Sequence, residues 1–307
     1  MRSRRSLVTV LVSVFVLALI HPATAAAASP EPVQTSPVQT SSEPMRYVAL
    51  GDSYTSGPLI PFQRLDRIGC LRSTNNYPSV VARRLGHTVL TDVSCAGADT
   101  TDVTRPQELA LGHNPPQFDA LRSDTDLVTI GIGGNDYGVF GSVIDTCPEL
   151  RETDPTGSPC QEHFTVDGTD TLKAAIDRTR VDVETVLAGV RQRSPKATIL
   201  LIGYPRIAPP SGTCPHILPF SDGDYAWLND IEETLNAALA TAAANSGTGT
   251  TFIDTYPASL GHDACSDHAW FQGRVLNPIG AAHYHPNHWG MEGVAEVILD
   301  HLAARGR

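Results

Sequence analysis

The segment YVALGDSYTSG, residues 47–57, decides the fold and raises the question of function. Its apolar run stops abruptly at Gly51-Asp52-Ser53, a pattern typical of a buried strand that ends in a turn. A serine in such a turn is either a plain turn residue or the nucleophile of a hydrolase. The rest of the chain must decide between these two interpretations.

Four further runs share the length and the Val, Ile and Leu content of the first. None alternates between apolar and polar residues, which is typical of strands that are buried on both faces of a parallel sheet. The five predicted strands are residues 46–50, 88–93, 127–132, 198–203 and 251–254.

Segments with helical spacing of apolar residues follow or separate these runs. The clearest begins after Asp170, a predicted N-cap, and the others are residues 77–85, 116–121, 224–244 and 287–304. The alternation predicts an α/β fold of three α/β/α layers around a central five-stranded parallel sheet. We expect long loops at 54–76, 138–168, 206–223 and 258–285 to surround the carboxyl ends of the strands, where such sheets bind ligands.

The N-terminal region is predicted to lie outside this domain. Residues 1–25 combine three arginines, a mainly apolar run from Leu7 to Ile20 and Ala23-Thr24-Ala25, as a cleaved secretory signal peptide does. Residues 26–44 contain the repeat PVQTS twice and have the composition of a disordered linker. We therefore expect a secreted protein with a single domain at 45–307 and no permanent membrane anchor.

Charge and cysteine content restrict the partners further. The formal net charge is −11, which disfavours nucleic acid and anionic lipid as partners, and we expect a monomer. An even number of cysteines behind a signal peptide indicates three disulfides. The sequence contains no CxxC pair, so it gives no indication of a zinc site. The pairing stays open among fifteen connectivities of Cys70, Cys95, Cys147, Cys160, Cys214 and Cys265.

Four residues that follow the apolar runs or precede the last helix form a chemically coherent set: Ser53, Gly97 in SCAGA, Asn135 in GGND and His285 in HPN. Histidine can remove the serine proton near neutral pH. The backbone N–H groups of Ser53 and Gly97 and the Asn135 amide can stabilise an oxyanion, each donor contributing about 3–4 kcal/mol. This set is sufficient for acyl transfer, so we expect no cofactor.

The blocks GDSYTSG, SCAGA, GGND and HPN together resemble those of the SGNH (GDSL-type) hydrolases, and their order matches that family over residues 45–303. Cys70-Leu71-Arg72-Ser73 and Tyr77-Pro78 further resemble its secreted actinobacterial lipase and esterase branch. The resemblance implies a flavodoxin-like sheet, activity on carboxylic esters and a Ser53, Gly97 and Asn135 oxyanion hole. It also implies disulfides Cys70–Cys95, Cys147–Cys160 and Cys214–Cys265.

An α/β-hydrolase fold is excluded by the residues around the serine. That fold requires the nucleophile elbow G-x-S-x-G, but Thr55 occupies the second glycine position here.

The chain departs from the SGNH pattern at the acid that orients the histidine. Most members have aspartate three residues before the histidine, where this sequence has Ala282. We expect a backbone carbonyl, most simply that of Ala282, to accept the His285 Nδ1–H and give a Ser–His dyad. The alternative is that Asp263 or Asp267 supplies the missing carboxylate.

Several nearby polar residues have simpler interpretations. His262, His268, His283 and His288 surround His285 in sequence, but their spacing matches no closed metal site, so we expect polar loop residues and no metal. Asp52 and Asp136 are interpreted as structural.

The sequence predicts a secreted serine esterase or lipase with a small-molecule or lipid ester as substrate. Carbohydrate acetylesterase and phospholipase or acyltransferase activities are alternatives on the same scaffold. A non-catalytic binding module is another, and only the missing aspartate favours it.

Overall fold

Five parallel strands form the central sheet in the order β2-β1-β5-β8-β9. The structure, a computed structural model, describes residues 43–306, so the predicted signal peptide and nearly all of the linker lie outside the described residues. The strands are β1 (Met45–Gly51), β2 (Thr88–Asp92), β5 (Leu127–Gly131), β8 (Thr198–Ile202) and β9 (Thr250–Ile253). All five lie where the apolar runs predict them.

Both faces of this sheet are buried, which explains the unbroken apolar runs. Successive side chains of a strand point to opposite faces. In β1, Val48 and Leu50 accordingly join one hydrophobic core, whereas Tyr47 and Ala49 join the other. A polar residue at any of these positions would be buried on one side or the other.

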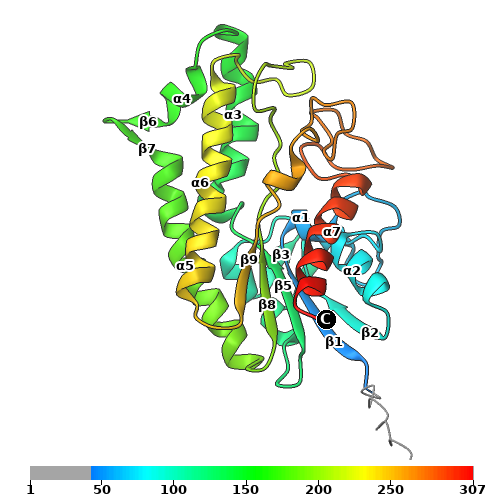
Figure 1. Cartoon of the computed structure of the whole chain (residues 1–307). Helices are drawn as coiled ribbons and strands as arrows, with labels where there is room; N and C mark the ends of the chain where they lie inside the picture. The colour runs from blue at the N-terminus through cyan, green and yellow to red at the C-terminus, as the bar shows by residue number, and fades with distance from the viewer. Residues whose placement is uncertain (1–42, 307) are drawn as a thin grey trace, which may run out of the picture. The chain divides into compact units, whose positions relative to one another are not determined.

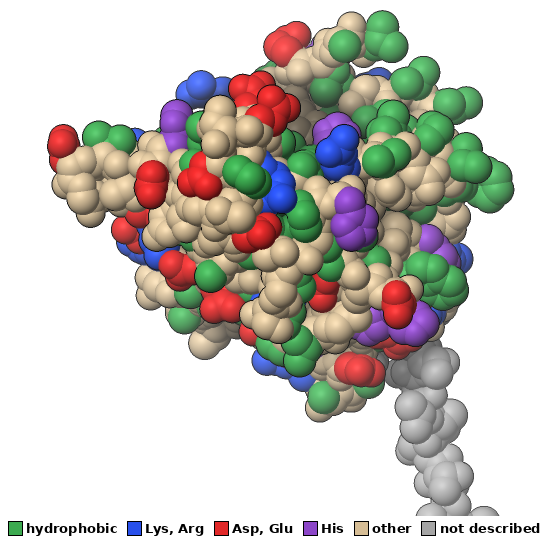
Figure 2. Space-filling model, turned by 90° about the horizontal axis from the view of Figure 1, so that it is seen from above, with side chains coloured by type: hydrophobic (Ala, Val, Ile, Leu, Met, Phe, Trp, Pro, Cys, Tyr) green, Lys and Arg blue, Asp and Glu red, His purple; other side chains and the backbone are tan. Residues whose placement is uncertain are grey.

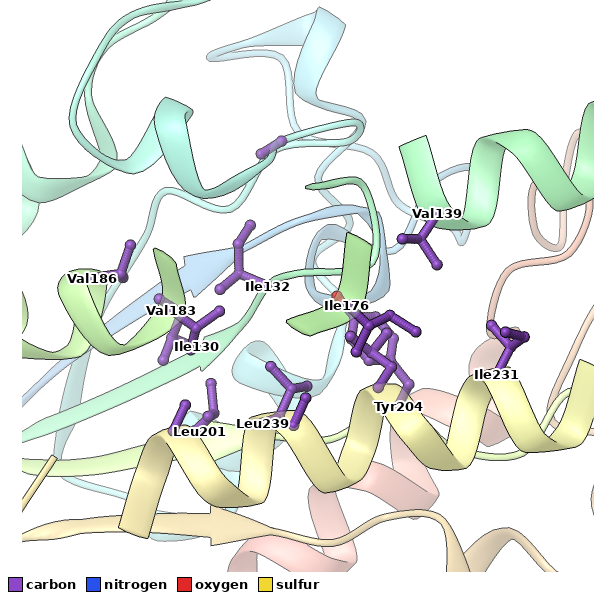
Figure 3. Close-up of a cluster of buried hydrophobic side chains, with 14 of the residues drawn as sticks. Ile130, Ile132, Val139, Ile176, Val183, Val186, Leu201, Tyr204, Ile231 and Leu239 are labelled. Carbon is purple, nitrogen blue, oxygen red and sulfur yellow. The ribbon is translucent and has the colours of Figure 1, made fainter. Parts of the chain in front are cut away.

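Helices cover the two faces, as Figure 1 shows. On one face α5 (Thr171–Arg193) packs beside α6 (Asp224–Asn245), and on the other α2 (Tyr77–Leu85) packs beside α7 (His288–Ala304). In the larger core, side chains from the helices, such as Val183 and Leu239, meet Ile130 and Leu201 of the sheet (Figure 3). The three-layer α/β/α prediction is confirmed.

Local signals fix where the helices begin. The Asp170 side chain accepts the N–H groups of Leu172 and Lys173 at 3.0 and 3.1 Å, so the predicted N-cap of α5 is confirmed. Asn287 caps α7 in the same way, through the N–H groups of Trp289 and Gly290. Each cap of this kind typically contributes about 1 kcal/mol.

Two sequence predictions about secondary structure were wrong. Residues 138–168 are not one long loop, because they contain α3 (Val139–Thr153) and α4 (Pro159–Phe164). Pro148 suggests a helix break, yet it lies inside α3. Residues 116–121 form only a 3₁₀ turn, Gln117–Ala120, instead of an α-helix.

Short elements complete the chain. They are α1 (Ser53–Ser56) directly after β1, and two hairpins formed by β3 (Gln107–Leu109) with β4 (Gly112–Asn114) and by β6 (Thr165–Val166) with β7 (Thr169–Asp170).

Candidate active site

Ser53 begins α1 at the carboxyl end of β1 and is 7 % exposed. The turn before it needs glycine, because Gly51 has φ +146° and a Cβ there would lie 2.5 Å from the Gly131 carbonyl oxygen. The Gln117 side chain holds the same residue from both sides: it accepts the Gly51 N–H at 2.7 Å and donates to the Gly51 carbonyl at 2.9 Å. The serine is therefore presented on a rigidly fixed backbone.

Asp52 is a structural residue of this turn. Its carboxylate accepts the Tyr54 N–H at 2.8 Å and the Tyr204 hydroxyl proton. The Tyr204 oxygen in turn accepts the Gly134 N–H at 2.8 Å. This chain of contacts joins the ends of β1, β5 and β8, and burial raises the pKa of Asp52 to about 7.

The expected oxyanion donors lie on segments that adjoin this turn. The Cys95 N–H donates to the Gly51 carbonyl at 2.9 Å, which brings the segment with Gly97 beside the nucleophile turn. Gly97 has φ +78°, a left-handed conformation that favours glycine. Within residues 43–306, neither the Ser53 N–H nor the Gly97 N–H has a hydrogen-bond partner, so both remain free to bind a ligand.

Asn135 is held against the same segment. Its side-chain amide donates one hydrogen bond to the Ala98 carbonyl at 2.9 Å, which leaves a second amide hydrogen for a ligand. The adjacent Asp136 accepts the Thr100 N–H and hydroxyl proton, and burial raises its pKa to about 7. Asp136 thus fixes the position of Asn135, as its structural interpretation requires.

His285 lies between β9 and α7, and the group that orients it is not the one expected. Its Nδ1 is 2.7 Å from the carbonyl oxygen of His283, so Nδ1 carries the proton and Nε2 the lone pair. The prediction of the Ala282 carbonyl was wrong, because that oxygen accepts the His285 backbone N–H at 3.2 Å. Tyr284, which lies between His283 and His285, has φ +57°. This left-handed conformation places the His283 carbonyl next to the imidazole ring of His285.

Neither alternative carboxylate takes the place of the missing aspartate. Asp263 is buried and accepts the Cys265 N–H at 3.0 Å, and Asp267 lines a separate pocket with His262 and His268. Among the hydrogen bonds and ion pairs of residues 43–306, no carboxylate contacts His285. The imidazole is half-buried among tightly packed neighbours, and this burial lowers the pKa of His285 to about 4.

Tyr54 connects the turn that carries Ser53 to the loop that carries His285, a role that the sequence reasoning missed. Its hydroxyl donates to the Tyr284 carbonyl at 2.8 Å, and its ring centroid is 5.5 Å from that of His285. A second contact runs from the Ala282 N–H to the Pro58 carbonyl at 3.1 Å. The available signal was an aromatic residue directly after the serine in GDSY. Tyr204 and Gln117, also missed, carried no comparable signal.

Three disulfides support the loops around the site. The pairs are Cys70–Cys95, Cys147–Cys160 and Cys214–Cys265, with Cα–Cα distances of 4.1, 5.2 and 5.9 Å. They are the pairs that the family resemblance implies. The first adjoins the segment of Gly97, and the last ties residues 206–223 to the histidine loop.

Residues 43–306 lack two kinds of feature. They contain no group of three or more His, Cys, Asp or Glu side chains able to hold a metal ion. No helix in the same residues is both long and apolar enough to cross a membrane.

The fold and the arrangement of the site are those of an SGNH-type α/β/α hydrolase. The model of the GDSL-like Lipase/Acylhydrolase family matches residues 49–292, and the chain belongs to this family. Among curated relatives, Lipase 2 of Streptomyces coelicolor is 38 % identical over 310 residues and the alignment covers 97 % of both chains. An esterase of Streptomyces scabiei is 31 % identical over 326 residues, covering 93 % of this chain and 90 % of the relative.

Two solved structures agree with this assignment. A phospholipase A1 from Streptomyces albidoflavus has a TM-score of 0.70 at 29 % identity and covers 84 % of this chain and 99 % of its own. The extracellular lipase from Streptomyces rimosus has a TM-score of 0.70 at 30 % identity, with 83 % and 99 % covered. The chain is therefore a carboxylic ester hydrolase.

Proposed function

We propose that the protein is a secreted serine esterase or lipase that forms an acyl-enzyme on Ser53. His285 acts first as base and then as acid, and the N–H groups of Ser53 and Gly97 with the Asn135 amide form the oxyanion hole. The observation that carries the proposal is the pair of unpartnered backbone N–H groups beside a serine whose neighbour, Tyr54, contacts the His285 loop.

In this proposal the two nitrogens of His285 have different roles. Nδ1–H is engaged by the His283 carbonyl, so Nε2 is the atom that can remove the Ser53 proton and later deliver it to the departing alcohol. Water then attacks the acyl-enzyme with the same nitrogen as base. A neutral carbonyl stabilises the imidazolium less than a carboxylate does, so this dyad relies more on the oxyanion donors than a triad does.

Exposed apolar side chains favour lipid esters over acetylated polysaccharide. Viewed from above Figure 1, hydrophobic side chains gather on one side of the face in Figure 2. Such patches mark surfaces for apolar partners, and the negative net charge favours neutral over anionic lipid. Two loops that meet at the Pro58 carbonyl contribute exposed Phe62, Leu65, Ile68, Val275, Leu276 and Ile279.

Secretion belongs to the same proposal. We infer that residues 1–25 are removed as a signal peptide and that residues 26–44 link the new N-terminus to a single hydrolase domain at 45–307. Three disulfides and the similarity to an extracellular lipase support an oxidising destination.

The test compares hydrolysis of p-nitrophenyl esters from acetate to palmitate by the wild type, Ser53→Ala and Ser56→Ala. Ser56 is a matched control, because its buried hydroxyl lies in the same helix and lacks a hydrogen-bond partner in the described chain. Ser53→Ala should lose about 10³-fold or more in kcat, and Ser56→Ala should stay within a few-fold of wild type.

The chain-length profile decides the substrate class. An optimum at octanoate or longer supports a lipase, and an optimum at acetate selects the carbohydrate acetylesterase alternative. A wild type without activity on any ester would contradict the proposal and favour the binding module.

A further inference from the structure

A groove of about 600 Å³ is lined in part by His283 and Tyr284, the two residues that precede His285. One wall is α3, and the other is formed by residues around Pro215 and Pro219 and by the segment from Arg274 to Tyr284. His283 and Tyr284, which line this groove, also supply the two carbonyl groups that hold His285 and Tyr54.

This location assigns the groove to one part of an ester substrate. In a serine esterase the histidine gives its proton to the leaving alcohol, so the alcohol portion must lie on the histidine side of the site. The groove is lined by His283, whose carbonyl engages Nδ1 of His285. It is therefore placed to receive whatever is attached to the alcohol.

The two walls carry opposite charges. Asp145, Glu149 and Glu152 are spaced by four and three residues along α3, which places them on one helix face. Arg274 and His283 stand on the other wall, and all five side chains are exposed. Within residues 43–306 none of the five forms an ion pair.

A second arginine in the groove is already engaged. Arg151 donates to the carbonyl groups of Pro155 and Phe220 and pairs with Asp222 at 3.1 Å. Arg274 is therefore the arginine of this groove that remains open to a ligand anion.

The α3 wall also carries an unusual acceptor. Pro148 lies within α3 and has no N–H, so the carbonyl of Ile144, four residues earlier, cannot receive its usual helical hydrogen bond. Both residues line the groove. Helix α3 thus carries a carbonyl without its usual helical donor in addition to the three carboxylates.

We propose that the groove binds the zwitterionic headgroup of a choline-type phospholipid, with the phosphate at Arg274 and His283 and the ammonium at the α3 carboxylates. The inference rests on the proposed function, since it deepens the substrate class of the same site. Guanidinium groups bind phosphate well, and carboxylates attract a quaternary ammonium through its opposite charge. A headgroup with negative charge alone meets the carboxylates unpaired, so it binds less well.

The first experiment measures kcat/KM on phosphatidylcholine and phosphatidylglycerol with identical acyl chains in neutral-detergent micelles, and on p-nitrophenyl butyrate. Arg274→Gln is compared with Lys196→Gln, which removes an exposed charge just before β8, at the opposite edge of the sheet. The double variant Asp145→Asn/Glu149→Gln is compared with Asp177→Asn, an exposed residue of α5.

Arg274→Gln should lower kcat/KM on phosphatidylcholine at least fivefold, chiefly through KM, and leave p-nitrophenyl butyrate within twofold. The α3 double variant should lower the preference for phosphatidylcholine over phosphatidylglycerol at least fivefold. The control variants Lys196→Gln and Asp177→Asn should change neither kcat/KM on phosphatidylcholine nor the preference for phosphatidylcholine over phosphatidylglycerol.

A second measurement avoids micelles. Free phosphocholine should inhibit hydrolysis of p-nitrophenyl butyrate competitively by wild type, and Arg274→Gln should weaken this inhibition at least fivefold. Normal butyrate hydrolysis by each variant shows that it has folded.

The outcomes separate the two proposals. If wild type cleaves p-nitrophenyl esters but does not cleave phosphatidylcholine, or if the groove variants leave its kcat/KM and the phosphocholine inhibition unchanged, the headgroup site is wrong and the proposed function stands. If wild type cleaves no ester, the proposed function itself fails, and the headgroup site with it.

Discussion

The two halves of the catalytic edge are built differently. The half that we propose to hold the nucleophile and the oxyanion donors, with Ser53, Gly97 and Asn135, lies where sheet strands end and is tied together through the sheet backbone. The histidine half lies in the long loop before α7, and its geometry depends on individual contacts such as that of Tyr54 with the Tyr284 carbonyl. A regular scaffold thus positions the proposed oxyanion donors, and an irregular one positions the proposed base.

Removing a donor from the regular half should have the largest effect. Asn135→Ala should lower kcat on p-nitrophenyl butyrate about 10²–10³-fold with little change in KM, because the amide acts on the transition-state oxyanion. Asn245→Ala, at the far end of α6, is the control. A loss below tenfold would mean that the strand ends do not form the oxyanion hole.

The pH profile tests the environment of the base. Burial lowers the pKa of His285 to about 4, so the neutral form needed for catalysis persists as pH falls until about that value. The acid limb of kcat/KM should therefore have its midpoint near pH 4. At pH 5 the activity should be about 30-fold higher than for a histidine of ordinary pKa near 6.5.

The acid limb caused by His285 is distinct from any effect of the buried carboxyl groups in the half that contains Ser53. The pKa values of Asp52 and Asp136 are raised by burial to about 7, so their effects appear near neutrality. A limb centred above pH 6 in wild type, Asp52→Asn and Asp136→Asn alike would show that the pKa of His285 is not lowered as described.

Tyr54 connects the two halves, and its hydroxyl should have a moderate effect. Tyr54→Phe removes the hydrogen bond to the Tyr284 carbonyl but retains the ring beside His285. Because one hydrogen bond contributes about 0.5–1.5 kcal/mol, kcat should fall about two- to tenfold with KM nearly unchanged. Tyr256→Phe, which removes a remote hydroxyl bonded to Asn229, should leave kcat unchanged.

The smallest effect is expected at the alternative acid. Asp267→Asn should change kcat less than about twofold, because the His283 carbonyl already engages Nδ1 of His285. The variant is assayed on p-nitrophenyl butyrate across the acid limb. A tenfold loss of kcat together with a shifted acid limb would show that the Asp267 carboxylate orients His285.

The sequence predicted the regular half far better than the irregular one. Strand ends and the GDS, SCAGA and GGND blocks indicate which residues share an edge, since parallel strands place their carboxyl ends together. Sequence spacing does not report a carbonyl direction. The choice between Ala282 and His283 depends on the left-handed conformation of Tyr284, which no local residue pattern announces.

Residues 138–168 show a second limit of sequence reasoning. Pro148 and the two cysteines Cys147 and Cys160 suggest a loop, yet α3 and α4 form there and a disulfide joins them. Tertiary contacts overrode the local signal of the proline. The proline and the cysteines therefore led to the prediction of a loop where α3 forms one wall of the groove that we assign to the headgroup.

The contact between Tyr54 and Tyr284 spans 230 positions of the chain. A ribosome must therefore release almost the whole polypeptide before the nucleophile can meet its base. A chain that ends before residue 285 carries Ser53 without His285, so under the proposed mechanism it has a nucleophile but no base.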